Sequence, residues 1–418
     1  MRTATKYWVG LVIILVMGGI GYGVYFIYNN TSLFSGNISN QDLADNNQNQ
    51  YGNSNLEIGL ETIDLLNLSE QSITVNGQEH TLNLPKGFNI SVFADGLAEP
   101  RFFTFTGKDN MVVADKGAGK IYLLKDENDN GQVDQKIEVD SGLRVIHSVH
   151  YYQGDLYAAE ENQVSVYRDF QEDGSYSDKE ILISDLPSGR GHSTRTVIIG
   201  PDDKIYLSIG SSCNVCEEED LRRAAIVRYD LDGSNMEIFA SGLRNSVGLG
   251  FFQDQLWAVN NGRDKIGDDR PTEEVNIIEQ DKHYGWPYCW GAGQTNPEFS
   301  GYENFCQNES VWPVYEMQAH SAPLGLAFLS EAKLFPADLL DNLFITFHGS
   351  WNRTVSTGYK VVRINPNDFQ RKNVNFITGW LQGDGSAWGR PVGVGFDQKG
   401  MMYVSDDRAG VIYRVTYQ

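Results

Sequence analysis

Residues 391–417 read PVGVGFDQKGMMYVSDDRAGVIYRVTY, in which three apolar runs are separated by two short polar turns. Short apolar runs bounded by Gly and Asp are typical of β-strands. The segment therefore predicts three antiparallel strands joined by tight turns. Similar segments recur upstream, so we interpret this one as a single unit of a repeated structure.

Five further copies of this pattern precede it. They begin with FFTFTGKDN at residue 102, HSVHYYQGD at 147, RTVIIGPDD at 195, SVGLGFFQD at 246 and PLGLAFLSE at 323. The first four starts are about 45–50 residues apart, which is the spacing of propeller blades, and inserted loops lengthen the later gaps. Abundant Gly and aromatic residues also favour many short strands. We predict an all-β, six-bladed β-propeller over residues 84–418.

The two ends of this domain are predicted to pair. ISVFADGL at Ile90–Leu97 resembles IFASGL at Ile238–Leu243, and each directly precedes a new copy, as an outermost strand should. No copy precedes the first of these strands, so we expect it to complete the last blade beside the strand that ends at Tyr417. This pairing would close the ring and remove exposed sheet edges.

The charge balance excludes one class of partner. The chain carries 55 acidic and 33 basic residues, a formal net charge of −22. Nucleic acids are bound through clustered Lys and Arg, so we expect no nucleic-acid partner.

The N-terminal region predicts a membrane anchor. Residues 7–28, YWVGLVIILVMGGIGYGVYFIY, contain no charge and are long enough to cross a bilayer. Arg2 and Lys6 precede them, and no basic residue follows until Lys86, so the positive-inside rule places residues 1–6 in the cytoplasm. We predict a single-pass cell-membrane protein with a transmembrane helix at 7–28, a low-complexity tether and lead-in at 29–83, and the propeller outside the cytoplasm. A cleaved signal peptide is the alternative, but no small-residue cleavage site follows.

Four cysteines fit this location. Cys213 and Cys216 lie in SSCNVCEEE, and Cys289 and Cys306 flank an aromatic, Gly-rich loop. Outside the cytoplasm, two local disulfides are the expected outcome. Haem attachment would need His where Glu217 stands, and no second CxxC completes a zinc site.

Polar residues at the starts of innermost strands should meet at one mouth of the central channel. Three segments place them there: GRGHSTRT with His192 and Arg195, SGLRNSVGL with Arg244 and Asn245, and WGRPVGV with Arg390. Their equivalent positions in different blades suggest one constellation. The alternative is that the arginines pair with acidic residues and merely tie blades together.

His192 is the candidate general base of this constellation. Flanking glycines let the backbone approach a ligand, and nearby Arg195 could lower the pKa of His192 so that it acts at neutral pH. A lone His is more often structural, and five other histidines compete for the role. Channel-facing arginines suit an anionic ligand, because guanidinium binds carboxylates with paired hydrogen bonds.

Three acidic segments could bind calcium. NNGRDKIGDDRPTEEVN, from residue 260, is dense in hard oxygen ligands beside Gly262. DENDNGQVD, from Asp126, and DFQEDGSYSDKE, from Asp169, echo calcium loops. For the segments from Asp126 and Asp169, the favoured interpretation is a turn between two strands, at which calcium could bind on the surface.

The combined motifs resemble a known family. GRGHSTRT, SSCNVC, RRAAIVR, GLRNSVGL, NNGRD, YGWPYCWG, HSAPLGLAF, FHGSWNR, GYKVVR, WGRPVGV and SDDRAGVIYRV are similar to the sorbosone-dehydrogenase branch of the soluble glucose/sorbosone dehydrogenases. The resemblance covers residues 84–417. It implies a propeller enzyme that uses pyrroloquinoline quinone (PQQ) and calcium.

The resemblance also implies residue roles. His192 would remove the substrate hydroxyl proton while hydride passes to the quinone. Arg244 and Asn245 would sit against the quinone, with Arg244 stabilising charge on its oxygen. The backbone carbonyls of Gly262 and Arg263 would hold the calcium ion, which polarises the quinone.

Further cofactor contacts are implied at Arg390 and Arg195. In the fifth blade the family's Ser-Leu-Lys contact is replaced by FHGSWNR, so Arg353 or Lys360 are the substitutes considered. Sugar-site loops differ as well, so glucose specificity does not follow.

Three functions are weighed. The leading one is a PQQ-dependent dehydrogenase that oxidises a sugar, sugar aldehyde or related alcohol and passes electrons to an external acceptor. The second is a calcium-dependent propeller lactonase, whose metal would be held deep in the channel by carboxylates and Asn. The third is a non-catalytic extracellular binding propeller.

Overall fold

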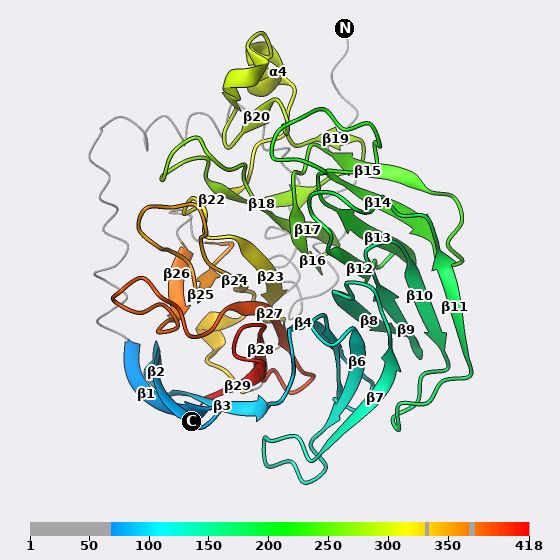
Figure 1. Ribbon diagram of the computed structural model, residues 1–418, viewed down its shortest axis with the longest axis vertical. Coiled ribbons are helices and arrows are strands. Elements are labelled where there is room, and N and C mark those ends of the chain that lie inside the picture. The colour runs from blue at the N-terminus through cyan, green and yellow to red at the C-terminus, as the bar shows by residue number, and fades with distance from the viewer. Residues whose placement is uncertain (1–67, 331–333, 368–372, 418) are drawn as a thin grey trace, which may run out of the picture. The chain divides into compact units, whose positions relative to one another are not determined.

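The predicted six-bladed propeller is confirmed. The computed structural model describes residues 68–330, 334–367 and 373–417, which contain a ring of six blades (Figure 1). Each blade has four antiparallel strands, and in blade 3 a short parallel strand, β19, extends the sheet beside the outermost strand. Blade 1 comprises β4 (Pro100–Phe105), β5 (Met111–Asp115), β6 (Lys120–Lys125) and β7 (Gln135–Ser141). Blade 2 comprises β8 (Ser148–Tyr152), β9 (Asp155–Ala159), β10 (Val164–Arg168) and β11 (Asp178–Ile183). Blade 3 comprises β12 (Arg195–Ile199), β13 (Lys204–Ile209), β14 (Ala225–Asp230) and β15 (Glu237–Ser241).

The second half of the ring carries the longer insertions. Blade 4 comprises β16 (Ser246–Phe252), β17 (Gln255–Asn260), β18 (Glu273–Ile278) and β22 (Tyr315–Met317). Blade 5 comprises β23 (Pro323–Phe328), β24 (Leu343–Phe347), β25 (Lys360–Ile364) and β26 (Asn373–Ile377). Blade 6 comprises β27 (Pro391–Phe396), β28 (Met402–Asp406), β29 (Val411–Tyr417) and β3 (Phe88–Ala94). The insertion between β18 and β22 contains β19 (Lys282–His283), β20 (Cys289–Trp290), β21 (Gln294–Thr295), the 3₁₀ helix η1 (Pro297–Phe299) and the helix α4 (Glu303–Asn308).

The ring closes as expected. β3 pairs antiparallel with β29, with Phe88 opposite Tyr417 and Ile90 opposite Val415. Each innermost strand contacts the next around the ring, in the order β4, β8, β12, β16, β23, β27 and back to β4. The strand from the start of the domain therefore completes the last blade and covers its edge.

The hydrophobic core lies between neighbouring blades. Ala114 and Ile121 of blade 1 pack with Val149 and Leu156 of blade 2, all almost completely buried. The middle strands are covered on both sides, so all five residues of β5 are buried and the first four are apolar. Burying each large apolar side chain contributes about 1.5–3 kcal/mol.

Residues 68–85, which span the end of the predicted lead-in at 29–83 and the first two residues of the predicted propeller, contain a β-hairpin. β1 (Leu68–Val75) pairs with β2 (Gln78–Pro85) across Asn76 and Gly77, whose φ angles are 50° and 75°. Leu82 and Leu84 are fully buried in one core cluster with residues of blades 5 and 6. Asn83 exchanges two backbone hydrogen bonds with Thr378, at 2.8 and 3.0 Å. The hairpin is therefore packed onto the propeller.

The predicted transmembrane helix at 7–28 lies outside the described residues. Within the part of the chain that the structure describes, no helix is long and apolar enough to span a bilayer. The acidic segments from Asp126 and Asp169 form the turns between β6 and β7 and between β10 and β11, as expected.

Candidate active site

One end of the ring collects the predicted site residues. Pairings such as Arg195 with Ile209 and Pro391 with Asp406 place the start of each first strand beside the end of the second. The loops before the first strands and after the second strands therefore share one end, here called the mouth. The mouth comprises residues 95–99, 116–119, 142–147, 160–163, 184–194, 210–224, 242–245, 261–272, 318–322, 348–359, 378–390 and 407–410.

His192 is oriented as a base. Its Nδ1 lies 3.1 Å from the carbonyl oxygen of Ser211 and 3.0 Å from the Ser211 hydroxyl. That hydroxyl donates to the Cys213 carbonyl at 2.7 Å, so both Ser211 oxygens accept from Nδ1. A carbonyl only accepts, so Nδ1 carries the proton and Nε2 keeps its lone pair.

Burial and nearby cations keep this imidazole neutral. Burial, followed by the charge of Arg244, lowers the pKa of His192 to about 3. Arg195 contributes in the same direction, as predicted, although Arg244 has the larger effect. At neutral pH the ring is therefore an unprotonated acceptor.

Asn245 and His192 both pack closely against Gly210. A Cβ atom on Gly210 would stand 2.5 Å from the Asn245 side-chain oxygen and 2.6 Å from the His192 Cβ. The backbone N–H of Asn245 donates to Asn260 Oδ1 at 3.0 Å. No hydrogen-bond partner of its side-chain amide is seen among the described residues, so this amide is available to a ligand.

Arg244 is fully engaged with protein acceptors. Its Nε donates to the Asn214 carbonyl at 3.1 Å, and Nη2 donates to Asn214 Oδ1 at 3.0 Å and to Asp264 Oδ2 at 3.2 Å. Nη1 donates to the carbonyls of Asn261 and Gly262, at 3.4 and 2.8 Å. These five bonds use all five N–H groups of a guanidinium. A direct hydrogen bond from Arg244 to a quinone would therefore have to replace one of these five bonds.

Arg195 anchors the loop that carries His192. It is fully buried, and Nη1 donates to the carbonyls of His192 and Thr194 at 2.9 and 2.8 Å. Nη2 donates to the Pro187 carbonyl. The structure thus places Arg195 beneath the loop, with its donors turned to the backbone.

Arg390 presents unused donors at the mouth. Its Nε donates to the His348 carbonyl at 3.3 Å, and its guanidinium lies 6.0 Å from the Tyr359 ring centroid. No partner of its two terminal amino groups is seen within the described ranges. Among the arginines predicted to bind the cofactor, this one has terminal N–H groups left for an anion.

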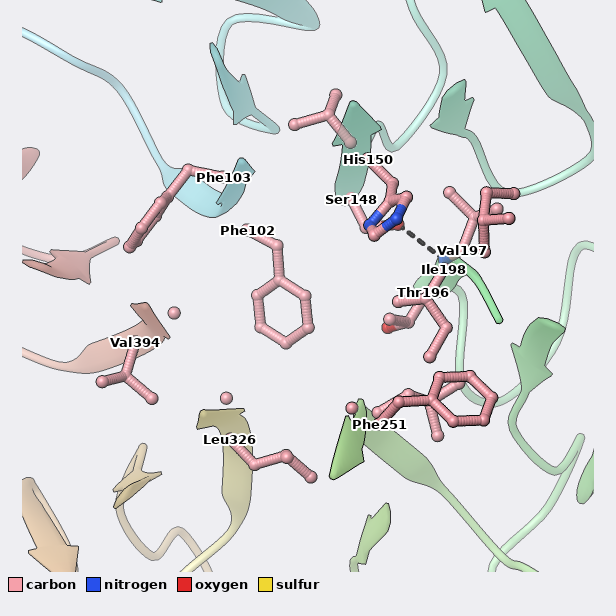
Figure 2. Close-up of a pocket in the computed structure, with 16 residues that line it drawn as sticks. Phe102, Phe103, Ser148, His150, Thr196, Val197, Ile198, Phe251, Leu326 and Val394 are labelled. Atoms are coloured by element: carbon pink, nitrogen blue, oxygen red, sulfur yellow. Dashed lines mark hydrogen bonds between the residues drawn. The ribbon is translucent and has the colours of Figure 1, made fainter. Parts of the chain in front are cut away.

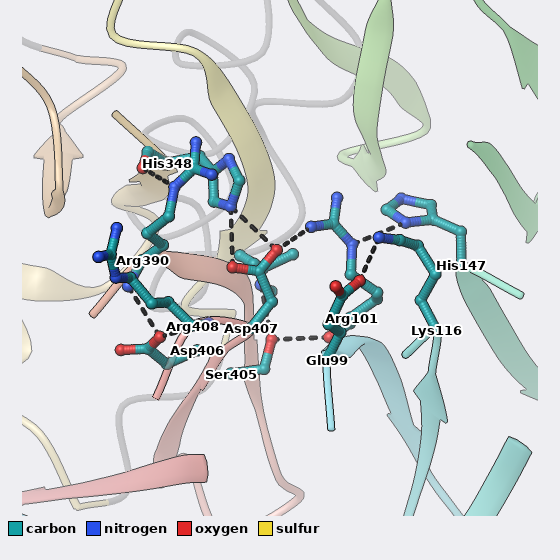
Figure 3. A network of polar contacts seen from close by, with 12 residues as sticks. Glu99, Arg101, Lys116, His147, His348, Arg390, Ser405, Asp406, Asp407 and Arg408 are labelled. Atoms are coloured by element: carbon teal, nitrogen blue, oxygen red, sulfur yellow. Dashed lines mark hydrogen bonds and ion pairs between the residues drawn. The ribbon is translucent and has the colours of Figure 1, made fainter. Parts of the chain in front are cut away.

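A buried ionic network borders Arg390 (Figure 3). Asp407 accepts from Arg101 Nη1 at 2.5 Å and from His348 Nε2 at 3.0 Å, and Arg101 Nε donates to His147 Nδ1 at 3.2 Å. Burial would raise the pKa of Asp407, but His348 and Arg101 outweigh it, so that pKa lies well below its usual range. Burial lowers the pKa of His348 to about 4, so it donates as a neutral ring. No local sequence pattern predicts this network, whose contacts join residues between 46 and 306 positions apart.

The two fifth-blade candidates differ in position. Arg353 Nη1 donates to the Asp268 carbonyl and Nη2 to Asp269 Oδ1, both at 2.7 Å, so it ties the fifth-blade loop to the fourth-blade loop. Lys360 begins β25, the third strand of its blade, opposite Phe347. For Arg353 and for Lys360, contact with the cofactor stays a prediction.

The acidic segment of blade 4 is not gathered into one ion site. Asp264 bonds Arg244, Asp269 pairs with Arg353, and Glu273 accepts from the backbone of Gly262 at 2.7 Å. Within the described ranges, the set of His, Cys, Asp or Glu atoms close enough to share a metal is Cys213, Cys216 and Glu218, and the two sulfurs form a disulfide. Among the described residues, the carboxylates of this segment are therefore not clustered in a group of three or more that could share one ion.

The predicted carbonyl ligands do not fit calcium in this arrangement. The Gly262 carbonyl accepts from the Arg244 guanidinium at 2.8 Å, and a divalent cation at the same oxygen would be repelled. The buried Arg263 side chain forms a bidentate ion pair with the half-exposed Glu298, at 2.5 and 2.9 Å. Calcium binding by Gly262 and Arg263 stays a prediction that requires Arg244 to release the carbonyl.

The central channel below the mouth has a different character (Figure 2). Its volume is about 360 Å³, and all six innermost strands line it, with Phe102, Phe251, Leu326 and Val394 among the apolar side chains. His150 is the titratable residue in this lining, and burial lowers its pKa to about 4. No lining residue is a carboxylate, so the candidate chemistry belongs to the mouth.

Both predicted disulfides are confirmed. Cys213 bonds Cys216 in the mouth loop between β13 and β14, and Cys289 bonds Cys306 in the insertion of blade 4. The haem and zinc alternatives for the CxxC are thereby excluded for this oxidised form.

Comparisons with known proteins agree with this architecture. Residues 82–418 match the TrAA12-like family. An uncharacterized protein of Borreliella burgdorferi is 30% identical over 392 residues, covering 89% of this chain and 99% of its own length. The PQQ-dependent sugar dehydrogenase of Hypocrea jecorina is 24% identical, over 82% of this chain and 92% of its own length.

A solved structure supports the fold. The holo PQQ domain of the pyranose dehydrogenase from Coprinopsis cinerea superposes with a TM-score of 0.70 at 22% identity, over 81% of this chain and 97% of that domain. The match to the family extends over the whole propeller, including every strand that borders the mouth. The chain therefore belongs to the TrAA12-like family of soluble PQQ-dependent sugar dehydrogenases.

Proposed function

We propose that this protein is a PQQ-dependent oxidoreductase that oxidises a sugar, a sugar aldehyde or a related alcohol at the mouth of its propeller. The observation that carries the proposal is His192, whose Nδ1–H is fixed by Ser211 and whose Nε2 is free to accept a proton. The names of the sugar dehydrogenase relatives support the choice of cofactor and substrate class.

The residues of the mouth fit a planar cofactor that bears carboxylates. Arg390 has two amino groups without a partner among the described residues, and the Asn245 amide lies in the same mouth, where Asn245 and His192 both pack against Gly210. Guanidinium and amide donors are suited to carboxylate and carbonyl oxygens. When bound, PQQ supplies a two-electron acceptor for hydride from the substrate carbon.

The protein's own groups would handle the proton and the charge. His192 Nε2 would take the hydroxyl proton of the substrate as its carbon is oxidised. The Ser211 carbonyl would then stabilise the resulting imidazolium through Nδ1–H. The fixed positive charge of Arg244 would favour negative charge that develops nearby.

The carboxylates of the cofactor would also adjust the base. In the structure, burial and Arg244 hold the pKa of His192 at about 3, which makes it a weak base. An anion placed among these arginines would offset their charge and raise that pKa toward neutrality. Catalytic competence of His192 is thus expected to depend on the bound cofactor.

The membrane anchor at 7–28, an extracytoplasmic propeller and an external electron acceptor complete the proposal. Two disulfides in the propeller support an oxidising compartment. Protease added to intact cells should degrade the propeller, whereas protection of the propeller until the membrane is permeabilised would oppose this topology.

The test is reconstitution of the protein with PQQ, with and without calcium, followed by a panel of aldoses and sugar aldehydes with an artificial acceptor. We expect turnover that His192→Ala abolishes and that the channel variant His150→Gln retains. A folded protein that binds PQQ but oxidises nothing in the panel would restrict the substrate class. Absence of PQQ binding would favour the binding propeller.

The lactonase alternative has less support. It predicts carboxylate ligands deep in the channel, and the described lining residues there include none.

A further inference from the structure

Asn214 occupies a central position in the mouth. It lies between the two cysteines of the Cys213–Cys216 disulfide, in the loop between β13 and β14. Its carbonyl accepts from Arg244 Nε at 3.1 Å and from Trp286 Nε1 at 3.2 Å. Its side-chain oxygen accepts from Arg244 Nη2 at 3.0 Å and from the Asp264 backbone at 2.8 Å. Its side-chain nitrogen donates to the Asp264 carbonyl at 3.1 Å.

These contacts join loops from two blades and from the insertion of blade 4. Arg244 precedes the first strand of blade 4, Asp264 follows its second strand, and Trp286 belongs to the insertion. Asn214 bonds all three from blade 3. Two of the five hydrogen bonds made by Arg244 go to Asn214, so this residue contributes much of the cage around the guanidinium.

The same disulfide-closed loop also supports the candidate base. The Ser211 hydroxyl donates to the Cys213 carbonyl at 2.7 Å, while Ser211 accepts from His192 Nδ1. The Ser212 backbone donates to Glu218 Oε1 at 2.7 Å, beyond the disulfide. One short segment, residues 211–218, therefore orients both His192 and Arg244.

We propose that Asn214 is a positioning residue that holds the Arg244 guanidinium beside His192, and that the Cys213–Cys216 disulfide holds Asn214 in place. The consequence for catalysis rests on the proposed function, but the geometric part does not. Replacing the side chain would remove the acceptor of one Arg244 Nη2 N–H and of the Asp264 backbone N–H, and buried donors without partners favour rearrangement.

The charge of Arg244 gives a direct readout. Arg244 is the largest electrostatic contributor that lowers the pKa of His192. When the bond to the Asn214 side chain is lost, Asp264 and Glu273 still attract the guanidinium, and it should move with greater freedom. The pKa of His192 should then rise by about one unit, the size of effect expected from one nearby charge.

The experiment is an NMR titration of His192 in the cofactor-free protein, which is independent of turnover. Asn214→Ala should raise the pKa of His192, and Cys213→Ser/Cys216→Ser, which keeps Asn214, should raise it as well. Asn128→Ala is the matched control, because Asn128 bonds Asp134 in an exposed turn of blade 1. That control should leave the titration unchanged.

A double-mutant cycle tests whether Asn214 acts through Arg244. In the Arg244→Met background, Asn214→Ala should produce no further shift, because the charge is already gone. A folded Asn214→Ala protein with an unchanged pKa, or an equal shift in both backgrounds, would overturn the inference. If Asn214→Ala does not fold, the disulfide variant decides in the same way.

The two proposals fail separately. A pKa shift without PQQ binding would retain the positioning role and reject the proposed function. PQQ-dependent turnover without a shift in the His192 pKa would retain the proposed function and reject the positioning role of Asn214.

Discussion

The buried pair between Asp407 and Arg101 should be a major source of stability at the mouth. Their side chains are 11% and 7% exposed, and the charged atoms are 2.5 Å apart. Asp407→Asn keeps the size of the side chain but removes the charge, which leaves the Arg101 guanidinium buried without its counter-ion. Breaking one side of a buried pair costs about 3–5 kcal/mol, so we expect a loss of that size in the free energy of unfolding.

The chain offers a matched control. Asp129 pairs with Lys399 at 3.1 Å, but the side chains are 75% and 52% exposed. Asp129→Asn should therefore cost only about 0–1 kcal/mol. Urea unfolding at pH 7 measures both variants, with unchanged slopes showing that the denatured states are comparable.

The comparison has a clear refuting result. Equal losses in the two variants, or less than about 1 kcal/mol for Asp407→Asn, would show that the buried pair is not a stabilising element. The pH dependence provides a second check. The folded-state pKa of Asp407 is depressed, so its contribution is present above the unfolded pKa of about 3.9 and is lost as the pH falls through the lower folded value.

Three further predictions follow from the mouth. Gly210→Ala should displace His192 or Asn245 and lower kcat/KM by about tenfold or more. Gly107→Ala is the control, because its added methyl group meets open space and should have no effect, and equal kinetics for the two variants would contradict the packing around Gly210. PQQ binding should raise the pKa of His192 above about 3, because the carboxylates of the cofactor offset the arginine charge, and an NMR titration would measure the change. An unchanged pKa would place the cofactor elsewhere. Burial raises the pKa of Glu273 to about 7, so the stability that its protonated form contributes is lost as the pH rises from about 4.5 through 7. Glu273→Gln should therefore destabilise the protein less at pH 8 than at pH 5, and a larger loss at pH 8 would refute the raised pKa.

The fold could be predicted because its signals are local and repeated. Each blade begins with an apolar run such as PVGVGF at Pro391, and the extra strand at Ile90 has no other blade to complete. The hairpin at 68–85 was missed although its signal was present. Asn76 and Gly77 form a turn pair between alternating segments, a recognised hairpin pattern.

The candidate site was predictable only in part. His192, Arg244 and Arg390 could be placed at the mouth, because each directly precedes an innermost strand. Their partners could not be predicted, since Asn214 and Asp407 reach them through long-range loop contacts that leave no periodic pattern. For the same reason, the sequence did not show that Arg195 faces the backbone or that Arg244 covers the Gly262 carbonyl.

The most direct test of the central claim is a titration of the cofactor-free protein with PQQ, followed by calorimetry. We predict one binding site per chain, with affinity reduced about 10²-fold or more by Arg390→Ala, because this change removes charge-assisted bonds of about 1.5–3 kcal/mol each. The channel variant His150→Gln should bind as the wild type does. Affinity unaffected by Arg390→Ala but lost in His150→Gln would contradict the account and place the ligand in the channel.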